Sequence, residues 1–387
     1  MLRPEIAACE RELVAMRRHL HERPELAFQE FETAEFVANR LQEWGFEVAR
    51  GIAETGVVGT LRCGEGPRKI ALRADMDALP MVEETGLSYA SHTKGRMHAC
   101  GHDGHVTMLL GAARELARSR DFSGTVHVIF QPAEEDISGA KRMVAEGIFE
   151  RFPCDAVFAL HNMPGAPLGK FLVRSGPIMA ASDVATITLR GAGGHAAMPH
   201  LTRDPVVAGA SLVMALQSIV SRNRDPHDPA VVTVGTFQAG TVSNVIPDTA
   251  TLTVDVRSFS APLRAMLEQR IRAIAAHQAD SFNVTAEIKY ENFYPVTVNS
   301  ERETRFLNDA ALRFAGPENV EVLARPYPYS EDFSYMLQVK PGSYFILGMG
   351  DGPGLHTTQY DFNDAALPIG ASFWVSLVED FLRLEHA

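Results

Sequence analysis

The segment KIALRAD, residues 69–75, is a short, nearly continuous apolar run that ends in a carboxylate. Three later segments have the same character: TVHVIFQ (125–131), AVFALH (156–161) and SYFILGM (343–349). Runs of this length without alternation are typical of strands that are buried on both faces of a parallel sheet. We therefore expect these four segments to be core strands of one sheet.

Helical patterns lie before, between and after these strands. Examples are GHVTMLLGAARELA (104–117) and ASFWVSLVEDFLRL (371–384), and the first segment of the chain also has helical spacing and ends before Pro24. Alternating strands and helices indicate an α/β fold, that is, a mixed and mostly parallel sheet with helices on both faces.

Residues 183–295 follow a different order. Their patterns are strand (183–191), helix (205–220), two strands (230–237 and 249–258), helix (261–278) and strand (283–291). This β-α-β-β-α-β order is the ferredoxin-like one. A chain of 387 residues also exceeds the size of one ordinary core. We therefore predict an inserted ferredoxin-like α+β domain at 182–296 between two parts of a catalytic domain, 1–181 and 297–387.

Composition excludes several classes of protein. The chain is 46% hydrophobic and 22% charged, as expected of an ordinary globular protein, and its net charge of −12 disfavours nucleic acid and anionic membranes as partners. The N-terminal residues do not resemble a secretory signal, and we expect no membrane span. Four widely spread cysteines do not suggest a disulfide framework. A cytoplasmic location is the expectation.

Groups that can bind a metal or transfer a proton follow the predicted strands. In open α/β sheets, ligands bind outside the carboxyl ends of the strands, so these groups can converge on one site. They are Asp75 and Asp77, Glu134 and Glu135, His161, and His356 in a glycine-rich loop.

The segment MHACGHDGH (97–105) places Cys100 and His102 two residues apart, just before a predicted helix. An extended pair with this spacing can point both donors the same way, as metal ligands do. Two other interpretations stay open at this point. The pair is a buried cysteine with an unrelated histidine, or Cys100 is a nucleophile with a nearby base.

Glu134 and Glu135 end a strongly apolar strand. Two adjacent carboxylates at a sheet edge call for a positive charge nearby, and a divalent cation is the simplest one. One carboxylate can bind the metal while the other takes a proton from water. The alternative is a solvated helix start, where Glu is common.

Three residues of the inserted domain are candidates for substrate contacts. His195 lies among glycine and small residues in GAGGHAAMPH (191–200), where an exposed imidazole can donate to an oxyanion. Asn244 and Arg257 offer an amide and a guanidinium that can hold a carboxylate. A turn with an incidental histidine is the alternative for His195.

The order of several motifs resembles the M20 metallopeptidase family, nearly from end to end. Within that family, the sequence resembles the branch of N-acyl-L-amino-acid amidohydrolases of the hippurate hydrolase and indole-acetyl-amino-acid hydrolase type. The motifs are RADMDALP, MHACGHDGH, QPAEE, LHNMP, GGHAAMPH, NVIPDTATLTVDVRS, SEDFSYM and LHTTQYDFND. The resemblance implies a zinc-exopeptidase-like sheet and cleavage of N-acyl amino acids such as hippurate-type, N-acetyl or indole-acetyl conjugates.

The resemblance also implies roles for individual residues. Asp77 matches the family's catalytic-site aspartate, whereas Asp75 stands where other members have a ligand histidine. His195 resembles a histidine that reaches the neighbouring subunit's active site, which implies a homodimer through the inserted domain. Arg257 and Asn244 resemble contacts to the substrate carboxylate and carbonyl. The implied metal ligands are Cys100, His102, Glu135, His161 and His356, with Glu134 as general base.

Two divalent metal ions per subunit are implied as well. Cysteine, histidine and carboxylate ligands suit zinc, and manganese, cobalt and nickel stay open. The sequence departs from its relatives at RPYPY (325–329) and at TTQY (357–360), two segments expected to border the substrate pocket. A dipeptidase or N-carbamoyl amino acid hydrolase, a non-catalytic conjugate-binding protein and a redox or metal sensor built on Cys100 are the rival functions.

Overall fold

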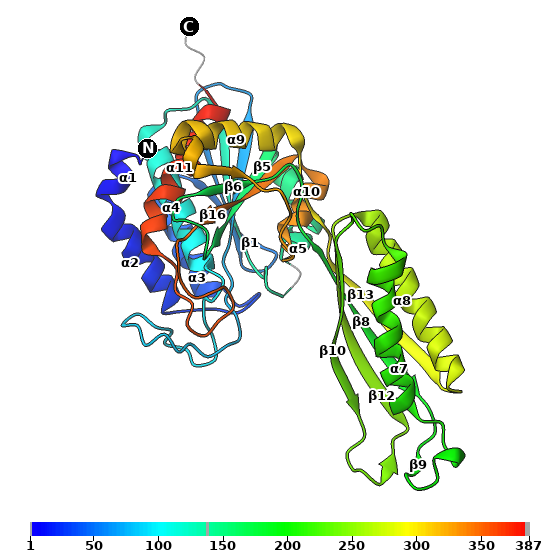
Figure 1. Ribbon diagram of the computed structural model, residues 1–387. Helices are drawn as coiled ribbons and strands as arrows, with labels where there is room; N and C mark the ends of the chain where they lie inside the picture. The colour runs from blue at the N-terminus through cyan, green and yellow to red at the C-terminus, as the bar shows by residue number, and fades with distance from the viewer. Residues whose placement is uncertain (1, 137–138, 384–387) are drawn as a thin grey trace. The chain divides into compact units, whose positions relative to one another are not determined.

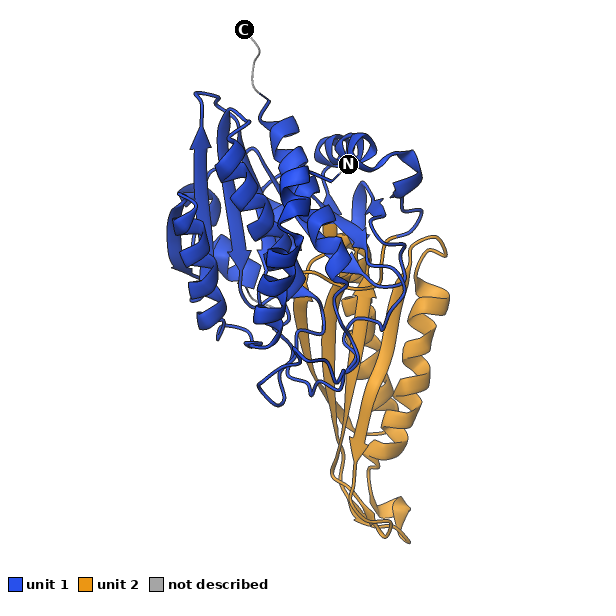
Figure 2. Ribbon diagram, turned by 90° about the vertical axis from the view of Figure 1, so that its left-hand side faces the viewer, with its two compact units in different colours: residues 1–178, 298–325, 332–387 blue, residues 179–297, 326–331 orange. Residues whose placement is uncertain are grey.

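The computed structural model describes residues 2–136 and 139–383. The chain forms two compact units, shown in blue and orange in Figure 2. Unit 1 comprises Met1–Ile178, Val298–Arg325 and Asp332–Ala387, and unit 2 comprises Met179–Thr297 and Pro326–Glu331. The sequence-based boundaries were 181/182 and 296/297. No local pattern in the sequence indicates that residues 326–331 belong with the inserted unit.

Unit 1 is built on an eight-stranded mixed sheet of order β1-β2-β4-β3-β5-β16-β6-β15 (Figure 1). Its four central strands, β4, β3, β5 and β16, are mutually parallel, as are β6 and β15. The pairs β1–β2, β2–β4 and β16–β6 are antiparallel. The strands are β1 (Glu47–Ile52), β2 (Gly56–Cys63), β3 (Lys69–Asp75), β4 (Gly124–Gln131), β5 (Ala156–Met163), β6 (Phe171–Val173), β15 (Val320–Val322) and β16 (Gly342–Gly348).

Helices cover both faces of this sheet. Figure 1 shows α4 and α11 on one side and α5 and α10 on the other. The helices of unit 1 are α1 (Pro4–Ala8), α2 (Glu10–His21), α3 (Phe31–Glu43), α4 (His102–Ser119), α5 (Gly139–Ala145), α6 (Ile148–Arg151), α9 (Glu301–Ala315), α10 (Phe333–Val339) and α11 (Leu367–Phe381).

The predicted α/β fold is confirmed, and the four predicted strands correspond to β3, β4, β5 and β16. The single first helix was wrong, because the chain breaks at Cys9 into α1 and α2. The helix predicted at 371–384 begins earlier, at Leu367, and ends at Phe381; residue 384 lies outside the described residues.

The core of unit 1 explains why these segments are so apolar. Every residue of β4 and β5 is buried. Side chains such as Phe130 and Phe158 pack in one cluster with Leu109 of α4 and Trp374 of α11. A strand covered by helices on both faces has no solvent side, so its sequence has no polar alternation.

Unit 2 has the predicted β-α-β-β-α-β order, with a four-stranded antiparallel sheet β10-β12-β8-β13. Helices α7 and α8 pack on it through one core cluster that includes Leu212, Leu267 and Val254. Its elements are β8 (Ala181–Arg190), β9 (Gly194–His195), α7 (Pro205–Ser218) with a π-helical extension (Ile219–Asn223), β10 (Ala230–Ala239), β11 (Val245–Ile246), β12 (Thr249–Ser258), α8 (Ala261–Ser281) and β13 (Thr285–Tyr294); the strands β7 (Gly176–Met179) and β14 (Thr297–Asn299) lie at the crossings between the units.

One helix corrects the expectation that no segment has the length of a membrane span. Residues 205–223, α7 with its extension, form a helix of 19 residues with an 18-residue stretch of mean hydropathy 1.3, which is long and apolar enough to cross a membrane by length and composition alone. Leu212 and Leu216 of this helix are buried in the core of unit 2, whereas Met214 is 71% exposed. The helix therefore combines a core face with an apolar exposed face.

Candidate metal centre

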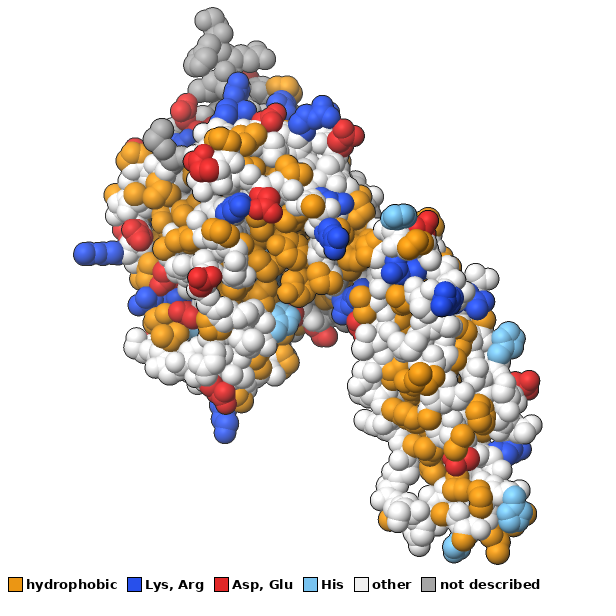
Figure 3. Space-filling model, in the orientation of Figure 1, with side chains coloured by type: hydrophobic (Ala, Val, Ile, Leu, Met, Phe, Trp, Pro, Cys, Tyr) orange, Lys and Arg blue, Asp and Glu red, His pale blue; other side chains and the backbone are white. Residues whose placement is uncertain are grey.

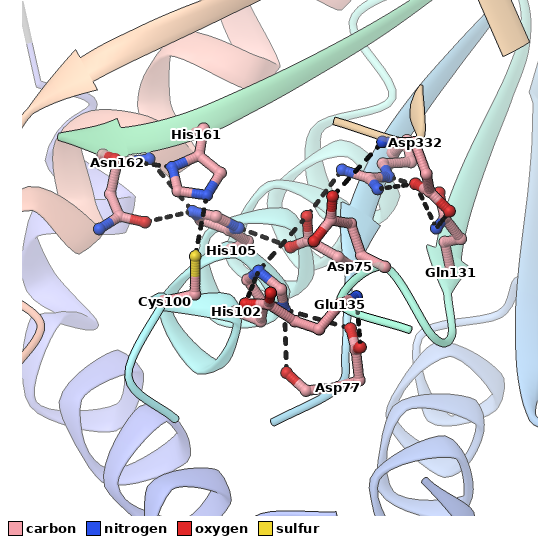
Figure 4. Close-up of polar contacts among 12 residues, drawn as sticks. Asp75, Asp77, Cys100, His102, His105, Gln131, Glu135, His161, Asn162 and Asp332 are labelled. Atoms are coloured by element: carbon pink, nitrogen blue, oxygen red, sulfur yellow. Dashed lines mark hydrogen bonds and ion pairs between the residues drawn. The ribbon is translucent and has the colours of Figure 1, made fainter. Parts of the chain in front are cut away.

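The carboxyl ends of β3, β4, β5 and β16 meet at one edge of the sheet of unit 1, because these strands are parallel. Asp75 ends β3, Glu134 and Glu135 follow β4, and His161 lies near the end of β5. Cys100 lies just before α4, and His102 is its first residue. Figure 4 shows most of these side chains converging from their separate elements.

The five side chains proposed as ligands form a continuous series of close contacts. Cys100 Sγ lies 3.4 Å from His161 Nε2 and 3.3 Å from His356 Nε2. His356 Nε2 lies 3.1 Å from Glu135 Oε1, which in turn lies 4.0 Å from His102 Nε2. Such crowding of donor atoms is the arrangement that a metal site needs.

Backbone and carboxylate groups orient two of the histidine rings. His102 Nδ1 lies 2.9 Å from Asp77 O and 3.2 Å from Asp77 Oδ1, and His161 Nδ1 lies 2.7 Å from Asn162 O. Each Nδ1 faces an acceptor oxygen, which turns Nε2 of His161 toward Cys100 and Nε2 of His102 toward Glu135. Metal-ligating histidines are held in this way.

Two non-glycine residues at the site have a positive φ, which side chains rarely adopt. His356 has φ 59°, and its N–H donates to Ala99 O at 2.8 Å, which ties the glycine-rich loop to the segment of Cys100. Ala133 has φ 53° and precedes Glu134. Non-glycine residues in this region are strained and are held by their surroundings.

The residues fit a metal ion. His102 Nε2 is buried without a hydrogen-bond partner in the described part of the chain. Glu135 Oε1 also lacks hydrogen-bond geometry, although it lies 3.1 Å from His356. Donor atoms of Cys100, His102 and His161 lie within 4.8 Å of one another, as do those of Cys100, Glu135 and His356 and those of His102, Glu134 and Glu135. A divalent cation would satisfy the unpartnered nitrogen and oxygen, and the adjacent thiol of Cys100 adds a sulfur ligand.

The charges around the site favour the binding of a cation. Burial and the charges of Glu135 and Glu134 raise the pKa of Cys100 well above its ordinary value. Burial alone would lower the pKa of His102, but the charges of Asp75, Asp77 and Glu135 outweigh it and raise this pKa to about 10. Cys100 is thus surrounded by carboxylate charge, which a bound cation would offset.

Glu134 and Glu135 occupy different surroundings. Glu134 Oε1 accepts a hydrogen bond from the N–H of Asp332 at 3.4 Å, whereas the backbone N–H of Glu135 donates to Asp77 Oδ2 at 2.9 Å.

Glu30 is a buried carboxylate near the site that sequence reasoning missed. It accepts from Ala133 N at 2.8 Å and from Thr55 Oγ1 at 2.6 Å. Its burial, together with the charge of Asp77, raises the pKa of Glu30 to about 7.

A buried polar network lies beside the proposed ligands. Arg73 Nη1 donates to Asp75 Oδ2 at 2.7 Å, and Asp75 Oδ1 lies 2.6 Å from His105 Nδ1. Both carboxylate oxygens of Asp75 are therefore engaged, one by Arg73 and the other by His105. Sequence reasoning missed His105, although it lies within MHACGHDGH, one helical turn after His102; that spacing on one face of α4 is the signal that could have found it.

In unit 2 the structure brings His195 and Asn244 together. His195 of β9 pairs with Val245, and Ala196 N donates to Asn244 O at 3.1 Å. Both residues are exposed. Ala197 N donates to His195 Nδ1 at 3.1 Å, so the hydrogen of this ring is on Nε2 and is free to be donated outward.

Arg257 lies at the other end of the unit 2 sheet. On β12 it pairs with Ser182, whereas Thr249 pairs with Arg190 next to the β9 segment. Eight residues of strand separate the two ends by about 27 Å. The guanidinium is already engaged, by two hydrogen bonds to Asp255 (3.0 and 2.8 Å) and one to Ser330 Oγ (2.7 Å).

The two segments that depart from the family pattern make internal contacts. Tyr327 and Tyr329 stack with ring centroids 6.1 Å apart, and Ala180 N donates to Tyr329 O at 2.7 Å. In the TTQY segment, Thr358 Oγ1 and Gln359 Nε2 donate to Glu84 at 2.9 and 2.6 Å.

Comparison with known proteins agrees with this geometry. Residues 71–380 match the model of peptidase family M20/M25/M40. The chain is 43% identical to the hippurate hydrolase of Campylobacter jejuni (98% of this chain, 99% of the relative) and 39% identical to the N-acetyl-L-cysteine deacetylase of Bacillus subtilis (96% and 88%). Among solved structures, a dinuclear metal-binding M20 peptidase of Bacillus subtilis, YxeP, superimposes with a TM-score of 0.84 at 33% identity (98% and 99%). On fold, donor set and sequence alike, this chain belongs to peptidase family M20/M25/M40.

Proposed function

We propose that this protein is a metal-dependent amidohydrolase that cleaves N-acyl amino acids into a carboxylic acid and a free amino acid. The observation that carries the proposal is the cluster of five donor side chains. A sixth side chain, Glu134, lies beside the cluster, with a carboxylate oxygen within 4.8 Å of the ligand atoms of His102 and Glu135. The relatives that bear names for such reactions, hippurate hydrolase and N-acetyl-L-cysteine deacetylase, support it.

Two divalent ions would be held by Cys100, His102, Glu135, His161 and His356, and when bound they supply Lewis-acid activation of water and of the amide carbonyl. Glu134 is the proton carrier. It accepts a proton from the attacking water and delivers it to the nitrogen of the leaving amino acid as the C–N bond breaks. Asp77 orients His102 and the backbone of Glu135 rather than touching the reacting atoms.

His195 and Asn244 serve, on this proposal, the active site of a second copy of the chain. Within one chain about 27 Å of sheet separates them from the Arg257 end of unit 2, much more than a small N-acyl amino acid spans. The outward Nε2–H of His195 suits an oxyanion. Arg257 donates to Ser330 through Nη1 and to Asp255 through Nε and Nη2, which is three of the five N–H donors of a guanidinium, and the others can serve a substrate carboxylate.

The surface of unit 2 supports a homodimer. Hydrophobic side chains gather over this unit in Figure 3. Val207 and Met214 on α7 and Phe237 on β10 are 51%, 71% and 38% exposed. Apolar patches of this kind mark protein–protein contacts, and a second copy covers them with the same surface. Sedimentation of the purified protein tests the dimer, and a monomer at micromolar concentration contradicts it.

The deciding experiment is amine release from N-benzoyl, N-acetyl and indole-acetyl amino acids, with dipeptides and N-carbamoyl amino acids as alternative substrates. Metal-depleted protein is compared with protein given zinc, manganese, cobalt or nickel. We expect cleavage of N-acyl amino acids only after metal is restored. Cleavage of dipeptides or carbamoyl substrates alone would replace the proposal with the corresponding hydrolase, and no cleavage of any substrate would favour a binding protein.

A further inference from the structure

Asn162, at the end of β5, is fixed at both ends of its side chain although no catalytic step requires it. Its Oδ1 lies 2.6 Å from His105 Nε2, and its Nδ2 donates to Tyr360 Oη at 2.6 Å. The backbone N–H of Asn162 also donates to His105 Nε2 at 3.1 Å, so both the main chain and the side chain of Asn162 contact this ring nitrogen. Asn162 and Tyr360 are both 0% exposed. A buried amide bonded at both ends has one orientation only.

The other side of His105 anchors this arrangement to the sheet. Its Nδ1 lies 2.6 Å from Asp75 Oδ1, and Asp75 is bound to Arg73 on the same strand. The series Arg73, Asp75, His105, Asn162 and Tyr360 is therefore a continuous buried chain of hydrogen bonds. It joins β3, α4, β5 and the segment that follows His356.

This chain contacts the segments that carry the proposed ligands. The carbonyl oxygen of Asn162 accepts from His161 Nδ1 at 2.7 Å. Gly101, between Cys100 and His102, has φ +95°, and a Cβ placed there would lie 2.5 Å from Asn162 Oδ1 and 2.6 Å from Tyr360 Oη. The Asn162–Tyr360 pair thus fills the space directly over this glycine and fixes the turn that presents both neighbouring donors.

We infer that Asn162, held between His105 and Tyr360, is a positioning residue for the metal centre: it sets the ring of His161 and the Cys100–Gly101–His102 turn at the same time. The inference rests on the proposed function in so far as these three side chains are metal ligands. Groups behind metal-bound histidines typically change metal affinity 10- to 100-fold when they are removed.

The test is the variant Asn162→Ala, with Tyr360→Phe as a milder change that removes only one of the two bonds. Metal dissociation constants are measured by chelator competition, and the absorption spectrum of the cobalt(II) protein reports ligand geometry. We expect at least one of two metals to bind about 10- to 100-fold more weakly in Asn162→Ala, with an altered cobalt spectrum, and a smaller change in the same direction in Tyr360→Phe.

His127→Gln is the matched control. His127 is also buried, and both of its ring nitrogens contact polar atoms: Nδ1 contacts Thr60 Oγ1 at 2.9 Å and Nε2 contacts Pro153 O at 3.3 Å. These partners lie on β2 and in the segment before β5, not beside the proposed ligands. It should lower the melting temperature and leave metal affinity and the cobalt spectrum unchanged. Wild-type metal affinity and spectrum in Asn162→Ala, or an equal change in the control, would overturn the inference.

Failure of this inference and failure of the proposed function give different results. Wild-type protein that binds two metals but cleaves no N-acyl amino acid removes the proposed function and leaves the Asn162 comparison intact. Wild-type protein that cleaves its substrate while Asn162→Ala binds metal normally removes the inference alone.

Discussion

Asp77 accepts the backbone N–H of Glu135 on one carboxylate oxygen, at 2.9 Å, while its other oxygen lies 3.2 Å from His102 Nδ1. One buried carboxylate therefore fixes two proposed ligands that come from distant parts of the chain. Its place behind the donors gives Asp77 a positioning role, in contrast to Glu134, which lies among them.

Replacing Asp77 by alanine should weaken metal binding about 10- to 100-fold, because His102 loses the acceptor that orients its ring and Glu135 loses its anchor. Chelator competition measures this affinity. Asp183→Ala is the matched control, since Asp183 is a buried carboxylate of unit 2 bound to Arg264 and Tyr290. Equal metal affinity in the two variants would refute the assigned role of Asp77.

Glu134→Gln should lower kcat by about 10²- to 10⁴-fold, the range that a general base typically contributes, while both metals stay bound. Glutamine keeps the size of the side chain but cannot accept the proton of the attacking water. Glu135→Gln is the companion variant and should lose metal instead. Activity and metal content measured on the same samples separate the two roles, and an active Glu134→Gln protein would contradict the mechanism.

His195→Ala should lower kcat about 10²- to 10³-fold, as loss of an oxyanion donor typically does. If His195 serves the partner's site, mixing this variant with Glu134→Gln should restore activity, because hybrid dimers contain one site with both groups intact. The mixture is assayed after subunit exchange. A mixture no more active than its components would show that each chain uses its own His195.

The stability of the protein should fall as pH rises from about 7 to 9, because His21 is charged in the folded state. Burial alone would lower the pKa of His21, but its hydrogen bonds to Asp103 and Glu83 raise it to about 9 from 6.5, against the repulsion of Arg17. Because the pKa of His21 is higher in the folded than in the unfolded state, its charged form adds fully to the free energy of unfolding below the unfolded-state pKa. This contribution is lost as the pH rises through the folded-state pKa, a decrease of about 2 kcal/mol between pH 7 and 9.

Urea unfolding of metal-depleted protein at several pH values measures this dependence. The variant His21→Gln should show a smaller decrease over the same range, since it has no proton to lose. His98, also buried beside this cluster, has a pKa lowered to about 4 by burial and stays neutral throughout. Parallel curves for the wild type and the variant would assign the dependence to other groups.

The sequence predicted those parts of the fold that local patterns encode. The apolar runs located β3, β4, β5 and β16 closely, because strands covered on both faces have no polar positions. The pattern did not reveal the break at Cys9, which interrupts no apolar face. The short strands β6 and β15 were missed as well, since three residues carry no periodicity.

The residues of the candidate site were predictable where they directly follow a strand or belong to a motif. They were not predictable where their role depends on a partner that is distant in the sequence. Spacing and family motifs brought Cys100, Glu135 and His161 forward, and the structure places them together. Nothing local marks Glu30 or Asn162, because their partners Ala133 and His105 lie far away in the chain. Likewise, the ion pair of Arg257 with Asp255 depends on which face of β12 both residues share.

The position of β16 in the sheet means that unit 1 can finish folding only late in synthesis. β16 pairs with β5, yet the whole of 179–297 is synthesised between them. While the ribosome makes that insertion, the growing chain carries a buried-type strand with an open edge, a species prone to aggregation. Unit 2, nearly continuous in sequence, can fold during this interval. The ion-binding pocket, which needs His356, is closed only when translation is almost finished.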